Sequence, residues 1–355
     1  MKPNIKNYSF PEILSIFNDN GFPKYRAEQL FKEIYVKRVI SFDEMSLLPK
    51  EIKSFLNENY SLESFTDTKK FTSIDKSVKL LFTLNDGEAI ESVLMPWYDS
   101  DNENIVRTTL CVSSQVGCGL DCKFCATGTM GLIRNLEAHE IISQVIEAER
   151  QTKSKITNIV YMGMGEPLLN FRNVKQSILN LTDPMSNIIS RKRITVSTSG
   201  IVPKIKKLAE LKPNVKLAIS LHATTNGFRD KIVPINQKSN INQLMNAVED
   251  YYRITKKAIT YEYIPFDGQN DTEADAKRLA KISKRVPSRV NIIPFNDISF
   301  TNPSGFATTL KPSTPEKIIE FAKNIRKYGG VVTIRETFGK DINAACGQLA
   351  LNEKK

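Results

Sequence analysis

Residues 107–125 read RTTLCVSSQVGCGLDCKFC, a stretch that joins a predicted strand to a cluster of cysteines. Its first part belongs to the run VRTTLCV (106–112), which has the β-branched and apolar residues that are typical of strands. Three cysteines follow at Cys-x3-Cys-x2-Cys spacing, namely Cys118, Cys122 and Cys125. Gly117 and Gly119 allow the backbone to loop tightly at this point. We therefore expect the three thiolates to converge on one metal centre at the end of the strand.

The chemistry of the thiolates leaves two kinds of metal centre open. Soft thiolates bind Zn²⁺ or an iron–sulfur cluster. A structural zinc site needs four ligands, usually as two closely spaced pairs. The sequence has no second pair, so zinc would have to recruit His139 or a distant cysteine. A [4Fe–4S] cluster held by three cysteines keeps one iron open to a substrate or cofactor. The spacing favours the cluster, with the zinc loop as the alternative.

Outward from this stretch, short β-branched runs alternate with helical runs. Six strands are predicted, at 106–112, 156–162, 193–198, 215–220, 258–264 and 289–295, and a further run, VVTIRET, lies near 331. Stretches such as LEAHEIISQVIEAERQ and INQLMNAVEDYYRIT are amphipathic and long enough for crossover helices. These units predict an α/β fold with a parallel sheet, either doubly wound or curled into a partial barrel. Functional residues are then expected at the carboxyl ends of the strands.

The N-terminal part has a different pattern. Residues 1–65 have helical spacing of apolar residues. Two β-rich runs, SVKLLFTL and AIESVLM, flank Asn85-Asp86-Gly87 and predict a hairpin. The polar stretch YDSDNEN suggests a boundary near residue 100. We therefore expect the chain to divide into three parts: an N-terminal accessory domain with the hairpin (1–100), a core (101–300) and a C-terminal extension (301–355).

Charge and cysteine content limit the class of protein. The chain has 50 Lys and Arg against 39 Asp and Glu, a net charge of +11 that favours polyanionic partners such as RNA. Many of these basic residues lie in 191–216. They could form a surface that binds phosphate groups, or they could simply be the solvated face of a helix. No apolar stretch approaches the roughly 20 residues of a membrane span, and no signal peptide is recognisable. We expect a cytoplasmic protein that is not bound to membranes, in which an odd number of cysteines argues against a disulfide framework.

Several blocks resemble those of a known family. The cysteine motif resembles the signature of the radical S-adenosylmethionine (SAM) superfamily. Six blocks between residues 107 and 349 resemble, in order, those of the RlmN/Cfr family of RNA methyltransferases: RTTLCVSSQVGCGLDCKFCATG, NIVYMGMGEPLLN, ITVSTSG, AISLHA, VNIIPFN and DINAACGQL. YRAEQLFKEIY (25–35) is similar to the family's small accessory domain. The resemblance implies a TIM-like partial (β/α)6 barrel with a helical accessory domain and a β-hairpin, and a [4Fe–4S] cluster on the three cysteines.

The same resemblance implies a set of SAM contacts. Matching the blocks residue by residue gives Gly165, Glu166, Ser197, Ser220, Leu221, His222 and Asn296. All of them lie at or just beyond the carboxyl ends of predicted strands. Taken singly, each also has an ordinary structural explanation, such as a turn residue or a hydrogen-bonded loop histidine.

Catalytic roles are implied for two isolated cysteines and one carboxylate. Carbon 2 of adenine is not nucleophilic, so SAM cannot methylate it by polar displacement. In the family, one SAM methylates a cysteine that matches Cys346, and a second SAM per turnover yields the radical that activates this methyl group. Cys111 matches the thiol that releases the RNA adduct by forming a transient disulfide with Cys346. Glu91 matches the proton acceptor.

The implied substrates are an adenosine of 23S rRNA and an adenosine beside the tRNA anticodon, methylated at carbon 2. Pro167 and Ala223-Thr224 favour this RlmN pattern over the Cfr pattern, which implies carbon 8 of the same rRNA adenosine. The tail after GQL is short, at 350–355. The alternative to an enzyme is a zinc-containing RNA-binding protein. The expected partners are 23S rRNA, tRNA and an electron donor such as flavodoxin or ferredoxin, with a monomeric enzyme.

Overall fold

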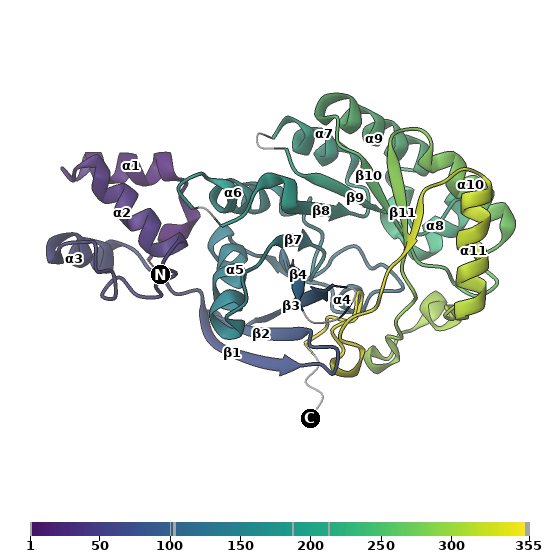
Figure 1. Ribbon diagram of the computed structural model, residues 1–355, viewed down its shortest axis with the longest axis horizontal. Helices are drawn as coiled ribbons and strands as arrows, with labels where there is room; N and C mark the ends of the chain where they lie inside the picture. Colours follow the sequence, from purple (N-terminus) through teal and green to yellow (C-terminus); the bar gives the residue numbers. More distant parts are fainter. Residues whose placement is uncertain (1, 100, 102–103, 187, 212–213, 352–355) are drawn as a thin grey trace.

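A computed structural model describes residues 2–99, 101, 104–186, 188–211 and 214–351. Within them, one ten-stranded sheet has the strand order β1-β2-β3-β4-β7-β8-β9-β10-β11-β12. The strands from β4 onward are parallel, whereas β1 to β3 join them by antiparallel pairing. Figure 1 shows the parallel strands curving, with helices outside the curve. The α/β fold expected from the sequence is confirmed.

The parallel strands follow the β-branched runs of the sequence. Their bounds are β4 (Ile105–Val112), β7 (Asn158–Tyr161), β8 (Ile194–Thr198), β9 (Lys216–Ser220), β10 (Ile259–Tyr263), β11 (Ser288–Ile292) and β12 (Val332–Ile334). Alternate side chains point into the barrel and out towards the helices, because successive residues of a strand face opposite sides. In β4, for example, Leu110 and Val112 are buried in the core, and Cys111 faces the other side.

Helices connect consecutive parallel strands. They are α5 (Ala138–Thr152), α6 (Phe171–Thr182), α7 (Val202–Glu210), α8 (Asn226–Ile232), α9 (Ile241–Thr255), α10 (Glu273–Ser283) and α11 (Pro315–Lys327). Capping boxes begin α5 at Glu137 and α9 at Asn240. Such boxes satisfy backbone amides that the first helical turn leaves without partners. No described helix has both the length and the apolar composition to cross a membrane.

The N-terminal residues form a small helical unit, as the spacing of apolar residues predicts. It consists of η1 (Ile5–Asn7), α1 (Phe10–Asp19), α2 (Lys24–Tyr35) and α3 (Lys50–Asn59). Its contact with the barrel is polar as well as apolar. The Asn180 side chain, on α6, donates to the carbonyl oxygens of Lys6 and Tyr8, both at 3.0 Å. The Asn7 amide group donates to Glu137 at 2.7 Å.

The predicted hairpin forms from β2 (Val78–Leu84) and β3 (Ala89–Tyr98). The sheet extends beyond it on both sides, because β1 (Phe65–Thr72) pairs with β2 and β3 pairs with β4. Hydrogen bonds therefore join the hairpin to the barrel sheet. Residue 100, at the predicted boundary, lies outside the described residues, as do residues 352–355 of the tail. A separate two-stranded sheet, β5 (Gln115–Gly117) and β6 (Leu132–Asn135), flanks the cysteine loop.

The C-terminal segment returns to the beginning of the barrel. The Ala126 amide donates to the carbonyl oxygen of Gly347 at 2.7 Å, and the Thr127 hydroxyl donates to that of Leu349 at 2.5 Å. Both donors belong to α4 (Ala126–Thr129), directly after the cysteine motif. The last described residues therefore lie against the cysteine loop.

Candidate active site

The cysteine loop begins at a glycine that no other residue could replace without strain. Gly117 has φ +71°, and a Cβ there would lie 1.9 Å from the carbonyl oxygen of Gly131. That oxygen accepts a hydrogen bond from the Cys118 amide at 2.8 Å. Gly119 is less constrained, because its Cβ would make only ordinary contact, at 3.4 Å, with the Leu132 side chain. The tight turn predicted here thus depends on Gly117.

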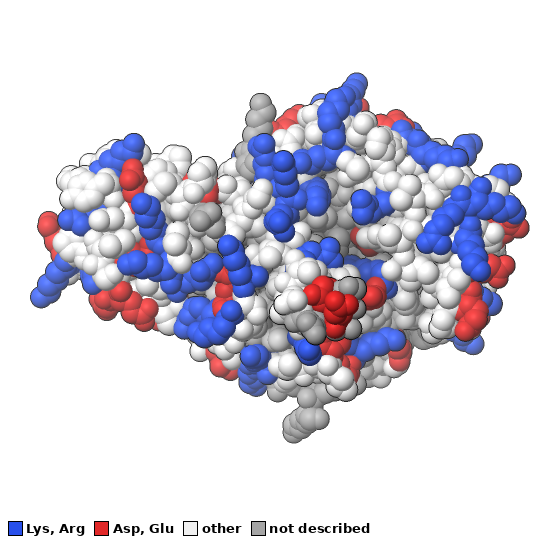
Figure 2. Space-filling view, viewed as in Figure 1, with Lys and Arg blue, Asp and Glu red and all other residues white. Residues whose placement is uncertain are grey.

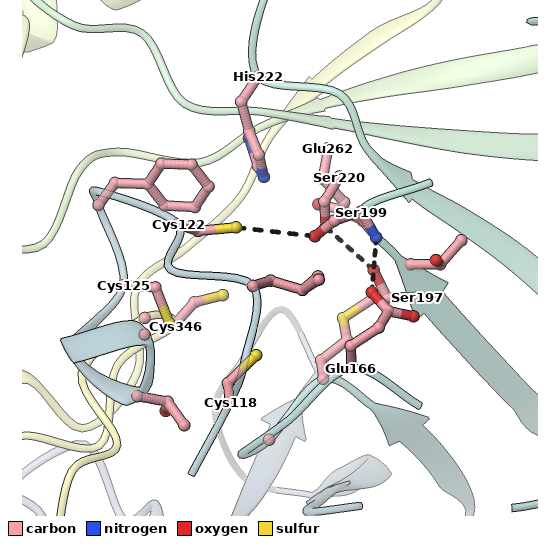
Figure 3. A pocket seen from close by; sticks show the side chains of 18 of the residues that line it. Cys118, Cys122, Cys125, Glu166, Ser197, Ser199, Ser220, His222, Glu262 and Cys346 are labelled. Atoms are coloured by element: carbon pink, nitrogen blue, oxygen red, sulfur yellow. Dashed lines mark hydrogen bonds between the residues drawn. The ribbon is translucent and has the colours of Figure 1, made fainter. Parts of the chain in front are cut away.

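The three clustered cysteines and Cys346 line one cavity, which we call the thiol cavity (Figure 3). It lies at the carboxyl ends of β7 to β11 and holds about 860 Å³ between protein atoms, including open space at its mouth. Burial raises the pKa of the Cys118 thiol to about 12 and raises that of Cys122 further. A metal centre bound here would therefore have to displace protons.

Gly165 and Glu166 line the cavity in the loop after β7. Gly165 has φ +95°, and a Cβ would lie 2.4 Å from that of Gln115. The Glu166 carboxylate accepts hydrogen bonds from the amides of Leu168, at 3.0 Å, and Ser199, at 2.8 Å. Burial nevertheless raises its pKa to about 7. A cationic group in the cavity would favour the ionised carboxylate.

Three more residues with predicted SAM contacts also line the cavity: Ser197, Ser220 and His222. The two serine hydroxyl oxygens are 3.3 Å apart across β8 and β9. The imidazole of His222 packs edge-on against Phe124, with ring centroids 4.5 Å apart. Burial and the nearby Arg229 lower its pKa to about 3, and its Nδ1 atom is buried without a hydrogen-bond partner. A neutral imidazole thus presents a free hydrogen-bonding atom at the cavity.

The other two predicted SAM contacts lie beside the thiol cavity. Leu221 packs in the hydrophobic core and does not line the cavity, although its sequence neighbours Ser220 and His222 do. Asn296 lines a smaller adjoining pocket, where its Nδ2 atom donates to the carbonyl oxygen of Cys346 at 3.0 Å. Its Oδ1 atom is buried without a partner. Asn296 therefore holds the Cys346 backbone and keeps one acceptor free.

Cys111 and Cys346 are both free thiols, and they come from opposite ends of the barrel sequence. Cys346 is exposed to the cavity, and Cys111 is half-buried on β4. Arg335, which lines the thiol cavity together with Cys346, acts electrostatically on both thiols. Burial raises the pKa of Cys111 to about 12, with Cys346 acting in the same direction and Arg335 in the opposite one.

Glu91 lies outside the lining of the thiol cavity. It is buried on β3, where its carboxylate forms an ion pair with Lys79, 3.0 Å from the Nζ atom. Its other oxygen accepts a hydrogen bond from the Leu351 amide at 3.2 Å. Burial raises its pKa, and Lys79 partly offsets this shift.

Two charged residues of the cavity were not predicted from the sequence. Glu262, on β10, is buried, with Oε1 accepting from Asn291 at 3.2 Å and Oε2 without a partner. Arg335, just after β12, interacts electrostatically with Glu262, Cys111 and Cys346. Both look like ordinary strand residues, because their neighbourhood depends on strands that are distant in sequence.

A second opening lies at the amino ends of the parallel strands. We call it the basic hollow, after its cationic lining by Arg107, Lys192, Lys216, Lys257, Arg289 and Arg335. Met162, Glu262 and Arg335 line both this hollow and the thiol cavity. Burial lowers the pKa of Lys216, and repulsion from Arg289 and Lys257 adds to this effect. In Figure 2, Lys and Arg side chains surround a recess in the displayed face.

The ligands in the thiol cavity bear on whether it holds a single metal ion or a cluster. Among the described residues, no three His, Cys, Asp or Glu side chains are grouped closely enough to hold one ion. A structural zinc ion would need four such ligands around it. A multi-iron cluster fits three thiols that surround open space, with free polar atoms of His222 and Asn296 nearby.

Comparison with known proteins identifies the family. The Radical SAM superfamily matches residues 112–280, and the Ribosomal RNA large subunit methyltransferase N-terminal domain matches residues 3–62. A probable dual-specificity RNA methyltransferase RlmN of Clostridium novyi is 41% identical over 98% of both chains. One from Thermotoga sp. is 42% identical over 99% of this chain and 98% of its own.

A solved structure agrees with these sequence relatives. A radical SAM methyltransferase from Sphaerobacter thermophilus superposes with a TM-score of 0.89 and 38% identity, over 98% of this chain and 99% of its own. Membership of the radical SAM superfamily carries with it a [4Fe–4S] cluster and SAM as cofactors. With relatives of this similarity over nearly its whole length, the chain belongs to the RlmN family of radical SAM RNA methyltransferases.

Proposed function

We propose that this enzyme methylates carbon 2 of an adenosine in 23S rRNA and of an adenosine beside the tRNA anticodon. The observation that carries the proposal is the position of Cys346 in the same cavity as the three cysteines of the radical SAM motif. The whole-chain similarity to RlmN proteins supports it. The family assignment replaces both alternatives drawn from the sequence, carbon-8 methylation and a zinc-containing RNA-binding protein.

Cys118, Cys122 and Cys125, which line the thiol cavity, would hold the [4Fe–4S] cluster. When bound, the cluster supplies the electron that turns SAM into the radical source for the methyl group on Cys346. Glu166 is placed to bind the amino group of SAM, because its buried carboxylate gains from a nearby cation. Ser197, Ser220 and His222 offer hydrogen bonds from the adjoining strand ends. Gly165, Leu221 and Asn296 complete the proposed contacts.

Cys346 would act as the methyl carrier, at a cost of two SAM molecules per turnover. Its thiolate attacks the methyl carbon of the first SAM, so that an S–CH3 bond forms and S-adenosylhomocysteine leaves. The radical derived from the second SAM would take one hydrogen atom from this methyl group, and the carbon would then bond to carbon 2 of the base. The resulting adduct would lose the carbon-2 proton and one electron, which the cluster would take back. The thiolate of Cys111 then attacks the Cys346 sulfur, the S–C bond breaks as a disulfide forms, and the released carbon takes up a proton to become the methyl group. An external donor returns two electrons to this disulfide.

Glu91 would accept the proton that leaves carbon 2. Its carboxylate is on the barrel sheet but is tied to Lys79 and to the Leu351 amide. Proton transfer therefore requires the segment around Leu351 to shift, so that the carboxylate reaches the base. The raised pKa of Glu91 suits an acceptor that works near neutral pH.

The basic hollow is the proposed entrance for RNA. Its cations are crowded together, so phosphate groups would relieve their mutual repulsion. Trp97 lines the hollow with Arg107 stacked over its ring at 4.1 Å, which offers a platform for an unstacked base. A base extruded into the hollow meets Met162, Glu262 and Arg335 before it reaches Cys346. The helical N-terminal residues would add RNA contacts as an accessory domain within 1–100.

The remaining partners follow from this chemistry. We propose flavodoxin or ferredoxin as the electron donor, because the cluster accepts one electron at a time. A monomer is proposed, since one chain supplies every residue named above. The cytoplasm is the expected compartment, where RNA substrates and reduced thiols occur together.

Analysis of methylated nucleosides tests the proposal directly. The anaerobically purified enzyme is incubated with SAM, a reductant and either an rRNA fragment or tRNA, and the digested nucleosides are identified by mass spectrometry. We expect 2-methyladenosine from both RNAs. Detection of 8-methyladenosine would reassign the target carbon. Absence of a methylated base from enzyme that cleaves SAM would refute the proposed substrates.

A further inference from the structure

Arg229 is a fully buried arginine that none of the proposed catalytic steps uses. It lies on α8, and its guanidinium group connects two loops of the thiol cavity. Its Nη2 atom donates to the carbonyl oxygens of Ser199, at 2.6 Å, and Ser220, at 3.1 Å. Its Nε atom donates to that of Leu221 at 3.0 Å. Arg229 thus ties the loop after β8 to the end of β9, where the proposed SAM contacts lie.

The charge of Arg229 is not matched by a carboxylate in direct contact. Its fourth hydrogen bond, from Nη1, goes to the neutral Oδ1 atom of Asn236 at 3.0 Å. The described ion pairs do not include Arg229, and Asp230 acts on it only at longer range. Asp230 is instead bonded to the Asn236 amide at 2.6 Å. A buried cation is costly unless an anion compensates it. Within the part of the chain that the structure describes, Arg229 therefore keeps a positive charge with no carboxylate hydrogen-bonded to it.

That charge lies beside one of the three cysteines of the motif. The Sγ atom of Cys122 is 3.9 Å from the Ser199 hydroxyl, and the carbonyl oxygen of the same serine accepts from Arg229. Cys122 and Arg229 also interact electrostatically. One-electron reduction adds a negative charge to a cluster and its thiolates. A buried cation in this neighbourhood favours the reduced form, because net charge and hydrogen bonding set the potential of such clusters.

We propose that Arg229 is a positioning residue that also supplies the buried positive charge stabilising the reduced cluster. Its hydrogen bonds hold the strand ends that would contact SAM, and its charge raises the reduction potential. The proposal rests on the proposed function only in requiring a cluster on Cys118, Cys122 and Cys125. It is independent of the RNA substrate.

A redox titration of the reconstituted cluster, without RNA, separates charge from hydrogen bonding. Arg229→Lys and Arg229→Gln both lose the planar fork of donors, but only lysine keeps the charge. Iron and sulfide content are measured first, and the reduced cluster is then followed by electron paramagnetic resonance. We expect Arg229→Gln to lower the ratio of reduced to oxidised cluster about tenfold at the wild-type midpoint, which is a shift of about 59 mV to more negative potential. Arg229→Lys should retain most of the wild-type midpoint.

Asp230→Asn gives an independent test with the opposite sign. It removes the nearest acidic influence on Arg229, and asparagine still offers an oxygen to Asn236. Its midpoint should move to more positive potential. If Arg229→Gln fails to bind a cluster, the midpoint potential of Asp230→Asn alone tests the electrostatic role. Equal midpoints for the lysine and glutamine variants, or an unchanged midpoint for Asp230→Asn, would overturn the electrostatic role. Missing RNA methylation would count against the proposed function and not against this inference.

Discussion

The carboxylate of Glu91 and the ammonium group of Lys79 form an ion pair, 3.0 Å apart, from which solvent is almost wholly excluded. The pair joins β2 to β3 on a sheet that continues into the barrel. It also lies directly beneath the C-terminal segment, because the Leu351 amide bonds to the same carboxylate. The carboxylate of Glu91, a proposed catalytic group, is therefore also part of the buried interior of the protein.

Removing one partner of this pair should destabilise the protein strongly. Lys79→Met leaves the Glu91 carboxylate buried without its cation, and we expect a loss of about 3–5 kcal/mol in the free energy of unfolding. Adding Glu91→Gln removes the remaining charge and should recover much of this loss. Urea unfolding of the apo-protein measures both values. Equal losses in the single and double variants would show that the ion pair is not their source.

Replacing Cys111 should trap the reaction at its covalent stage. Without the resolving thiol, the bond between Cys346 and the base persists, so Cys111→Ala should accumulate a protein–RNA adduct visible as a shifted band on a denaturing gel. Cys346→Ala is the matched control, because it has no sulfur to carry the methyl group and should give no adduct. Normal release of methylated RNA by Cys111→Ala would contradict the role of this thiol.

Two neighbouring glycines should respond differently to alanine. Gly117→Ala places a Cβ 1.9 Å from a backbone oxygen at positive φ, so we expect a severalfold loss of bound iron after reconstitution. Gly119→Ala meets only a side-chain contact at 3.4 Å and should bind iron normally. Iron and sulfide analysis, with circular dichroism as a folding check, measures the difference. Similar iron content in both variants would refute the steric argument.

Stability should depend on pH through Lys6. Burial lowers its pKa from 10.5 to about 7, although Glu147 and Glu63 act in the opposite direction. Between these two values the unfolded chain binds more protons than the folded one, so the free energy of unfolding should rise with pH across this window. The effect is on the order of a few kcal/mol. Lys6→Met should remove this rise. Urea unfolding of both proteins from pH 7 to 10 measures how the free energy of unfolding of each one changes with pH. Parallel pH profiles would exclude a contribution from Lys6.

The basic hollow should contribute more to RNA binding than the outer helix surface. Lys216→Gln removes a cation of the hollow, so RNA affinity should fall and the slope of log affinity against log salt should decrease by about 0.7–0.9. Lys207→Gln, on the exposed face of α7, is the control from the same basic run and should change neither. Fluorescence anisotropy at several salt concentrations measures both. A larger effect at Lys207 would place the RNA on the helix surface instead.

The parallel strands and their helices could be predicted because their signals are local. Runs such as RITVST and VKLAIS are β-branched, and the helices between them are amphipathic. The strand β1 was not predicted, since FTDTKKFT is mostly polar and exposed at the edge of the sheet. The strands β5 and β6 have three and four residues, which is too short for a periodic pattern.

The residues of the site could be predicted where they belong to a short motif of residues close together in the sequence. The cysteine spacing and the turn at Gly117 fall in this class. Glu262, Arg229 and Arg335 do not, because their importance depends on which strand ends they face after folding. Arg229 in the stretch GFRDKI even resembles an exposed helical residue, although it is fully buried. Tertiary packing, and not local propensity, gives such residues their environment.

The return of the C-terminal segment to α4 has a consequence for the order in which the enzyme is assembled. Ala126 and Thr127 receive their partners from Gly347 and Leu349, more than two hundred positions further along the chain. Closing so long a loop carries an entropic cost that only a largely formed barrel can offset. The thiol of Cys346, the proposed methyl carrier, should therefore arrive last during biosynthesis. Until then the cysteine loop remains open on that side, which leaves an interval in which iron and sulfide can be delivered.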